Sequence, residues 1–358
     1  MIRLSSIIEQ FETDFLHRYA KQLLPAQRKT LAVLKMCRTK YSPMMKAHCA
    51  HCHADRFLPH SCGNRHCPHC QHHESQQWLE NQCRKQLPAN YFMVTFTVPA
   101  QLRSLFYHHQ SQCYGIFFDC VWDTLQTFSR NDKQLKGTPG AITVLHTHSR
   151  ALSCHPHIHA VIPAAAIDKN QRLWREKKGK YLFNHTALAK VFRAKLLEKI
   201  VNEKLNLPDD CPKAWVVDCK YVGPGDKALI YLGRYLYRGV ISEKNILSCE
   251  NGKVTFRYLD SKTKAYQYKT VSGAGFLWLV LQHVLPKGFR RARNYGFLHP
   301  NSKRFITLLK FVLNHFSPEQ FQRKIKPRPQ LRCFCCGEAM QIVQTRIARL
   351  TRQSLVPV

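Results

Sequence analysis

Three histidines alternate within the short stretch His155-Pro156-His157-Ile158-His159. Successive side chains of a β-strand point to opposite faces, so all three imidazoles would lie on one face. His157 and His159 could then hold one divalent ion. The third ligand is left open by the spacing: His146 on the neighbouring strand is preferred, and His155 competes with it. Imidazoles that leave positions open to water suit Mn²⁺ or Mg²⁺ bound to a phosphate, so we expect a catalytic metal site here.

A pair of tyrosines forms the second candidate for chemistry. Tyr231 and Tyr235 are four residues apart, which places both phenols on one face of a helix. Aromatic pairs at this spacing also occur as plain core residues. Arg234 and Arg238 lie in the same segment and could contact phosphate. A tyrosine near a divalent metal can attack phosphorus and retain DNA as an ester, with Tyr237 as the next candidate nucleophile.

Clustered cysteines predict a different kind of metal site. Two C-x-x-C turns, Cys49–Cys52 and Cys67–Cys70, are separated by 14 residues. Each turn can direct two thiolates to one point, and two such turns complete a tetrahedral zinc site. We therefore expect Cys49, Cys52, Cys67 and Cys70 to hold one structural Zn²⁺, with Cys62 or His66 as possible substitute ligands. Arg65 beside this site is a candidate DNA contact.

A further C-x-x-C turn near the end of the sequence, Cys333–Cys336, has no obvious second half. Half a site is weak evidence for metal, and reduced or packed thiols are the alternative. The basic stretch 324–329 upstream of it is typical of an exposed linker that contacts the DNA backbone.

The composition of the chain indicates which broad class of protein carries these residues. The 358 residues carry a formal net charge of +33, which calls for a polyanionic partner such as nucleic acid. With 44% hydrophobic residues the chain can build a core, which excludes intrinsic disorder. No apolar run approaches the roughly 18 residues of a membrane span, and no secretory segment opens the sequence. We expect a cytoplasmic protein without a membrane partner, and cytosolic cysteines that bind metal rather than form disulfides.

Hydrophobic periodicity gives an α+β fold. Helices are expected upstream of residue 40 and over 100–129, 226–238 and 275–284. Strands are expected where β-branched and aromatic residues gather. These are 91–98, 141–147, 155–163, 215–222, 254–258 and 265–271.

Taken in order, these motifs resemble the two-tyrosine HUH transposases of rolling-circle insertion sequences. The resemblance rests on Asn64-Arg65-His66-Cys67-Pro68, Val144-Leu145-His146-Thr147, the histidine strand, Tyr231-Leu232-Gly233-Arg234-Tyr235 and Val284-Leu285-Pro286-Lys287-Gly288-Phe289. It spans about residues 1–310. It implies a helical zinc-binding module followed by an HUH nuclease domain on an RRM-like antiparallel sheet. We accordingly expect four regions: 1–85 zinc-binding, 86–240 nuclease, 241–320 its continuation, and 321–358 a basic cysteine-containing tail.

The resemblance also implies an activity. Such enzymes nick and rejoin single-stranded DNA through 5′-phosphotyrosine intermediates, here with Tyr231 and Tyr235 as nucleophiles and His157 and His159 as the metal-binding pair. The partner would be single-stranded element ends in a bacterial, nucleoid-associated setting. One alternative is a non-catalytic zinc-containing DNA-binding protein, such as a decayed transposase or regulator. Another is an RNA-binding protein that uses its basic field and aromatic residues.

Overall fold

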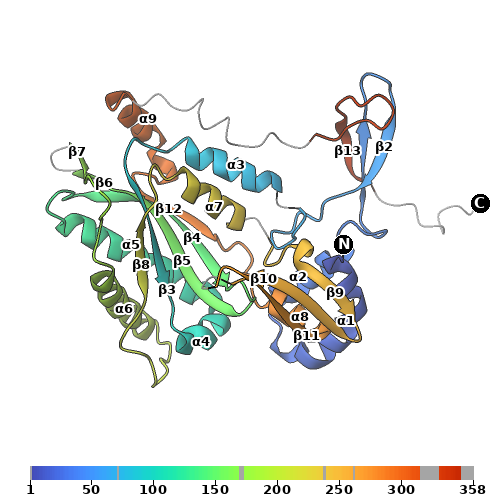
Figure 1. Cartoon of the computed structure of the whole chain (residues 1–358), viewed down its shortest axis with the longest axis horizontal. Coiled ribbons are helices and arrows are strands. Elements are labelled where there is room, and N and C mark those ends of the chain that lie inside the picture. The colour runs from blue at the N-terminus through green and yellow to red at the C-terminus, as the bar shows by residue number, and fades with distance from the viewer. Residues whose placement is uncertain are drawn as a thin grey trace, which may run out of the picture. The chain divides into compact units, whose positions relative to one another are not determined.

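The computed structural model describes residues 2–70, 72–168, 173–236, 239–260, 263–314 and 330–347, except the side chains of residues 72, 73, 234 and 235. The chain forms two compact units (Figure 1). The first gathers Met1–His73, Arg238–Val284 and Ile325–Val358, and the second gathers Glu74–Tyr237 and Leu285–Lys324. Helices and antiparallel sheets occur in both units, which confirms the predicted α+β class.

A seven-stranded sheet forms the centre of the second unit. Its strand order is β7-β6-β4-β5-β3-β8, with β12 also paired to β4, and the pairings are antiparallel. The strands are β3 (Tyr91–Thr97), β4 (Thr138–His148), β5 (Cys154–Pro163), β6 (Ala165–Asp168), β7 (Leu173–Glu176), β8 (Val217–Tyr221) and β12 (Ala292–Gly296). The predicted strands at 91–98, 141–147, 155–163 and 215–222 are therefore confirmed.

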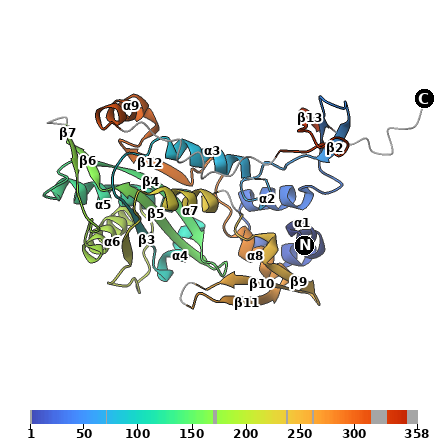
Figure 2. The same ribbon diagram turned by 45° about the horizontal axis from the view of Figure 1, so that its top comes forward.

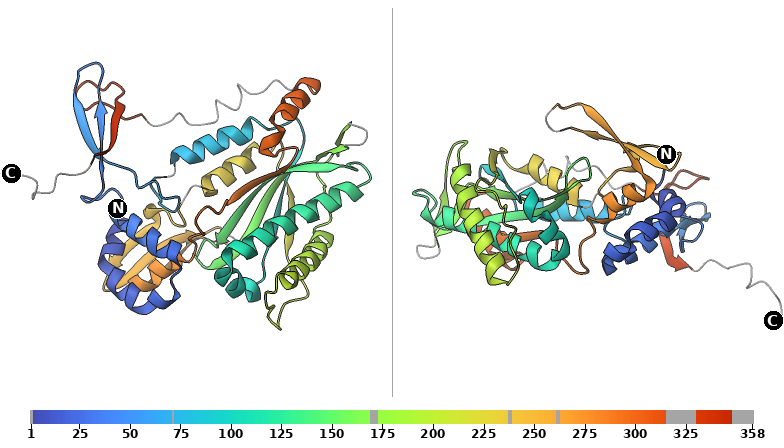
Figure 3. Two further views of the ribbon diagram at one scale, coloured as in Figure 1. Left: turned by 180° about the vertical axis from the view of Figure 1, so that it is seen from behind. Right: turned by 90° about the horizontal axis from the view of Figure 1, so that it is seen from below.

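Helices cover both faces of this sheet (Figure 3, left). One face carries α5 and α6, and the other carries α3 and α7. The helices of the unit are α3 (His72–Cys83), α4 (Arg103–His108), α5 (Gln110–Asn131), α6 (His185–Asn202), α7 (Asp226–Leu236) and α9 (Lys303–Val312). Strand residues alternate accordingly: Phe96 and Ile158 enter the core under α5 and α6, whereas Val144 and Val161 pack under α7.

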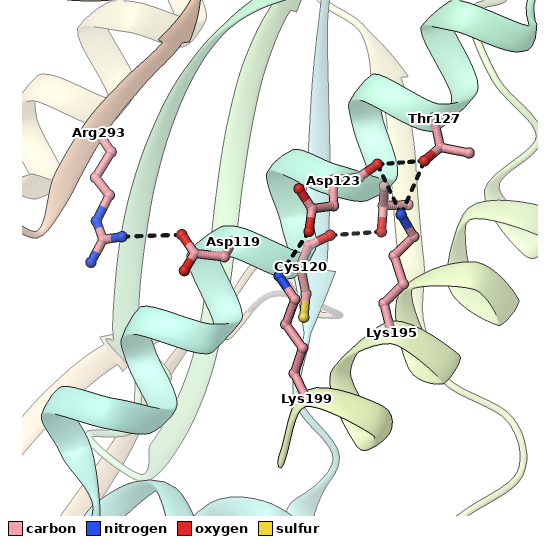
Figure 4. Close-up of polar contacts among 8 residues, drawn as sticks. Asp119, Cys120, Asp123, Thr127, Lys195, Lys199 and Arg293 are labelled. Atoms are coloured by element: carbon pink, nitrogen blue, oxygen red, sulfur yellow. Dashed lines mark hydrogen bonds and ion pairs between the residues drawn. The ribbon is translucent and has the colours of Figure 1, made fainter. Parts of the chain in front are cut away.

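Ion pairs join α5 to its neighbours on the face away from α7 (Figure 4). Lys199 of α6 reaches Asp123 at 2.8 Å, and Arg293 of β12 lies 3.6 Å from Asp119. Lys195 donates to the Thr127 hydroxyl at 3.0 Å. Each member of the Lys199–Asp123 pair keeps more than a third of its side chain exposed, so solvent screens the pair and its contribution to stability is small.

The first unit combines helices with two small sheets. Strands β9 (Ile246–Glu250), β10 (Lys253–Leu259) and β11 (Tyr266–Ser272) form one sheet in the order β11-β10-β9. Strands β1 (Met44–His48), β2 (Asp55–Pro59) and β13 (Gln341–Ile347) form the other, in the order β13-β1-β2. The helices are α1 (Leu4–Tyr19), α2 (Pro25–Met36) and α8 (Gly273–Leu281).

Helix α8 packs on α1, although more than 250 residues separate their sequences. The Tyr19 and Trp278 rings stack at 4.9 Å, and Gly273 sits against the Phe11 ring, where a Cβ would come within 2.2 Å. This packing places 238–284 in the first unit, whereas we expected 241–320 to continue the nuclease domain. Only Leu285–Lys324 joins the sheet unit. Periodicity identified the elements but could not show which core they enter. Within the described residues, none of the helices has the length and apolarity to cross a bilayer.

Candidate active site and metal centres

The structure brings His146, His157 and His159 together on the α7 face of the large sheet. Strands β4 and β5 pair antiparallel with His146 opposite His157 and Val144 opposite His159. The His146 ring centroid lies 5.0 Å from that of His157 and 4.4 Å from that of His159. One ring nitrogen from each histidine lies within 4.8 Å of the others, which is a spacing that one metal ion can bridge.

Hydrogen bonds at Nδ1 fix the orientation of two of these rings. The Nδ1 of His157 donates to the carbonyl of His155 at 2.7 Å, and a hydrogen bond of 2.9 Å joins the Nδ1 of His159 to the Thr95 hydroxyl. When Nδ1 donates, Nε2 keeps its lone pair. The buried Nε2 of His159 has no hydrogen-bond partner among the described residues. Metal-binding histidines are commonly held in this way, so the residues fit a divalent ion.

Burial keeps the cluster uncharged. Burial lowers the pKa of His159 to about 3 and that of His157 to about 4, and it lowers the pKa of His146 well below its ordinary value. The imidazoles are therefore neutral at physiological pH, which is the form that binds metal.

His155, the competing third ligand, lies outside the cluster. Arg103 Nη2 donates to its Nδ1 at 3.2 Å, which occupies that nitrogen. Burial, and after it the charge of Arg103, lowers the pKa of His155, and the same positive charge disfavours a metal cation there. His146 is the histidine that joins the pair. Sequence spacing could not show how β4 and β5 align. The observed register places His146 opposite His157 and so brings His146 into the cluster.

Tyr231 stands next to the histidines. Its ring centroid lies 5.8 Å from that of His159 and 6.2 Å from that of His146. Tyr231 is 43% exposed and lines an open cavity of about 660 Å³ together with Met93 and Gly223. Burial of the inner part raises the pKa of the phenol, and the nearby charge of Arg150 opposes that rise.

Packing on two sides fixes helix α7, which presents Tyr231. Leu229 and Leu232 are buried against the sheet. On the other side α7 lies along α3 (Figure 2), where a Cβ on Gly233 would be 3.3 Å from the Trp78 ring and Ser75 Oγ donates to the Gly233 carbonyl at 2.9 Å. Gly233 thus permits a close approach of the two helices.

Several predicted residues of this region lie outside the described part of the chain. The side chains of Tyr235 and Arg234 belong to this group, and so do Arg238 and Tyr237 entirely. Thr95 and Arg150 were missed by sequence reasoning. Thr95 carries a weak signal, because it pairs with His159 in the β3–β5 register, but that register requires the fold.

The cysteines form two clusters, and the predicted grouping of Cys49 and Cys52 with Cys67 and Cys70 is wrong. The first cluster contains Cys37, Cys62, Cys67 and Cys70, whose sulfur atoms lie within 4.8 Å of one another. The Sγ of Cys37 is 3.5 Å from those of both Cys67 and Cys70, and the Sγ of Cys62 is 3.7 Å from that of Cys70.

The end of α2 explains this outcome, because Cys37 is its C-terminal cap and completes the Cys67–Cys70 turn. Cys62 does act as the substitute considered from the sequence, whereas His66 lies outside the cluster. The side chain of Arg65 is partly buried, and burial lowers the pKa of its guanidinium.

Cys49 and Cys52 belong to the second cluster, with Cys333 and Cys336. The Sγ atoms of Cys49 and Cys336 are 3.5 Å apart, as are those of Cys52 and Cys333. The Cys333–Cys336 turn therefore combines with the Cys49–Cys52 turn to form a set of four thiols. Each set of four thiols matches the donor set of structural zinc.

Two protein families match this chain. Residues 140–304, which include the three histidines and Tyr231, match a family described as "Putative transposase". Residues 7–98, which include the first cysteine cluster, match the "Transposase zinc-binding domain". Fold, site and matches together define a transposase with a zinc-binding domain.

Similarity to individual proteins identifies the family of transposases to which the chain belongs. The chain is 32% identical over 316 residues to "Putative transposase y4qJ" of Sinorhizobium fredii, covering 80% of this chain and 79% of the relative. It is 28% identical over 265 residues to the transposase for insertion sequence element IS801 of Pseudomonas savastanoi pv. phaseolicola, covering 68% of this chain and 62% of that relative. The chain belongs to the IS91-type family of insertion-sequence transposases.

Proposed function

We propose that this transposase nicks and rejoins single-stranded DNA at the ends of a rolling-circle element through 5′-phosphotyrosine intermediates, as an HUH enzyme. The observation that carries the proposal is the position of Tyr231, a half-exposed phenol beside the buried, neutral His146 and His159, whose cluster His157 completes. A nucleophile beside a metal-binding set is the arrangement that phosphoryl transfer requires.

The histidine cluster is proposed to hold a catalytic Mn²⁺ or Mg²⁺. His146, His157 and His159 would bind it through the ring nitrogens that face one another. A divalent ion there would polarise the scissile phosphate and offset the charge that develops in the transition state. Mg²⁺ prefers oxygen ligands more strongly than Mn²⁺ does, so three imidazoles favour Mn²⁺.

Tyr231 would carry out the cleavage. Its oxygen attacks phosphorus, the bond from phosphorus to the 3′ oxygen breaks, and the proton lost by the phenol balances the one gained by that oxygen. The products are a free 3′-hydroxyl and a 5′-phosphotyrosine. Because the pKa of Tyr231 is raised, the phenol is protonated at neutral pH, and the positive charge of Arg150 helps it to ionise during attack.

Tyr235 is proposed to provide a second cleavage. It follows Tyr231 by four residues on α7, the spacing that puts two side chains on one helix face. With one DNA end held as an ester, a second tyrosine permits another cut before the first end is rejoined. The ester conserves roughly the energy of the broken bond, so rejoining needs no nucleotide cofactor.

The net charge supports DNA as the partner. A formal charge of +33 neutralises many phosphates and releases their counterions, so binding should weaken steeply with salt. A preference for single strands is proposed because a phosphodiester must leave the base-paired stack to reach Tyr231. Such a protein would work on the bacterial nucleoid in the cytoplasm, with Arg65, Arg234 and Arg238 as candidate DNA contacts.

A covalent-adduct assay tests the proposal. The protein is incubated with 5′- and 3′-labelled single-stranded oligonucleotides carrying element ends, with Mn²⁺ or Mg²⁺, and separated under denaturing conditions. We expect label from the 5′-phosphate side to remain on the protein, and the Tyr231→Phe/Tyr235→Phe variant to retain none. Tyr181→Phe, which changes an exposed tyrosine, is the matched control.

Two results would overturn the proposal. An adduct formed by the double variant would place the nucleophile elsewhere, with Tyr237 next to be tested. DNA binding by the wild-type protein without any adduct, under either metal, would favour the non-catalytic DNA-binding alternative.

A further inference from the structure

The second cysteine cluster joins two segments that lie far apart in the sequence. Cys52 and Cys333 are 281 positions apart, and Cys49 and Cys336 are 287 apart. Cys333 and Cys336 also lie outside both stretches that match known families, which end at residues 98 and 304. The matched zinc-binding domain therefore contains only half of this cluster.

The two halves have the same backbone conformation. Cys49 N–H donates to the carbonyl of the residue five positions on, Ala54, and Cys333 N–H donates likewise to Glu338. The residue after each second cysteine is left-handed: His53 has φ 56° and Gly337 has φ 76°. Its N–H donates back to the carbonyl of the first cysteine in both turns.

This repeated turn positions sulfur atoms for a metal. A left-handed residue after the second cysteine folds the chain back, so both thiols of a turn lie on its inner side. The N–H of Cys335 also donates to the Cys333 sulfur at 3.4 Å, an interaction that favours thiolate. The inter-turn S–S separations of 3.5 Å are close to the edge of roughly 3.8 Å that a tetrahedron with Zn–S bonds of about 2.3 Å has.

A small sheet connects the two turns. Strand β13, which follows the second turn, pairs with β1, which precedes the first, and β1 also pairs with β2. The buried apolar cluster beneath consists of Ala47, Cys49, Cys333 and Met340. These strands and turns amount to fewer than the ~40 residues below which a domain usually needs a metal or disulfides to fold. So few buried residues cannot hold the segments together without another source of stability.

We propose that Cys49, Cys52, Cys333 and Cys336 bind a second structural Zn²⁺, which completes a zinc ribbon assembled from two distant segments of the chain. Four thiolates select zinc and leave no position open for water, so the site stabilises the fold and does no chemistry. The transposase then contains two zinc ions, and the second fastens residues 331–347 to the zinc-binding domain.

Zinc content tests this proposal independently of catalysis. The measurements use full-length protein carrying His157→Ala and His159→Ala, so that the imidazole site contributes no zinc. After dialysis against metal-free buffer we expect two zinc ions per chain. Cys333→Ser/Cys336→Ser should retain one, and Cys335→Ser should retain two, because the exposed Cys335 thiol belongs to the same turn but not to the cluster.

X-ray absorption at the zinc edge guards against variants that misfold and lose both ions. In the protein with intact cysteines we expect every zinc to have four sulfur neighbours at about 2.3 Å. One zinc per chain, two zinc ions with nitrogen or oxygen neighbours, or a disulfide between cysteines of this cluster in freshly purified protein would each overturn the proposal. Two all-sulfur zinc ions that survive Cys333→Ser/Cys336→Ser would overturn it as well.

Discussion

The histidine site and the second cysteine cluster bring their candidate metal ligands together in opposite ways. His146, His157 and His159 come from two paired strands and lie within 13 positions of one another in sequence. The thiols of the second cluster come from segments 281 or more positions apart. Pairing of two strands that are neighbours in sequence builds the first site, whereas the second requires that most of the chain has been synthesised. Tyr231, which lies beside the histidines, lines an open cavity, an arrangement that suits catalysis. Four thiols would leave no open position on a zinc ion, an arrangement that suits a structural role.

The largest expected effect, on zinc content and on folding, comes from removing a cysteine of the first cluster. Cys67→Ser should release zinc from the first cluster and unfold the zinc-binding domain, because structural zinc contributes on the order of 10 kcal/mol to folding. Zinc analysis and limited proteolysis measure the loss. Cys335→Ser should behave as wild type, and unchanged zinc content in Cys67→Ser would mean that the first cluster is not a metal site.

Substitution at the histidine site should lower activity without disturbing the fold. We expect His159→Ala to lower DNA cleavage by at least about 10³-fold, since a metal contributes several kcal/mol to transition-state stabilisation. The zinc bound by the cysteine clusters and the salt dependence of DNA binding should stay unchanged. His155→Ala is the matched control, because its ring bonds to Arg103 rather than entering the cluster. Equal losses in both variants would contradict the assignment.

A weaker effect is expected from the residue that orients His159. Thr95→Val removes the hydroxyl that bonds to the Nδ1 of His159, and loss of such a partner typically weakens metal affinity 10–100-fold. Titrating activity against Mn²⁺ should show a shifted midpoint with the maximum rate recovered at saturating metal, and Thr95→Ser should restore the midpoint. A reduced maximum at an unchanged midpoint would show that Thr95 does not act through the metal.

The smallest effect should come from the face of the sheet that carries neither site. Lys199→Met breaks the ion pair with Asp123, and exposed pairs contribute roughly 0–1 kcal/mol (Figure 4). Thermal unfolding should shift by a few degrees at most, with cleavage unchanged. A marked loss of cleavage would mean that this surface takes part in DNA binding or catalysis.

Sequence reasoning succeeded where the pattern was local. Period-two alternation put His157 and His159 on one face, and apolar and β-branched runs located the strands that carry them. It failed where identical half-sites could combine in several ways. A C-x-x-C turn shows that two thiols converge but not which other thiols they meet, so Cys49–Cys52 was paired with the wrong turn. Cys37 carries no local signal at all, since only the end of α2 brings it to Cys67.

The separation of Cys52 from Cys333 also sets an order of events during synthesis. All four ligands of the first cluster are available once residue 70 has been made, whereas the second must wait for Cys336. At about 5–20 residues per second, the 281 positions between Cys52 and Cys333 take roughly 14–56 s to translate. Throughout that interval the thiols of Cys49 and Cys52 lack the other two members of their cluster, so they can be oxidised or can bond to another chain. Ribosomes that stop before Cys333 would therefore release a protein whose histidine strands are complete but whose zinc ribbon can never close.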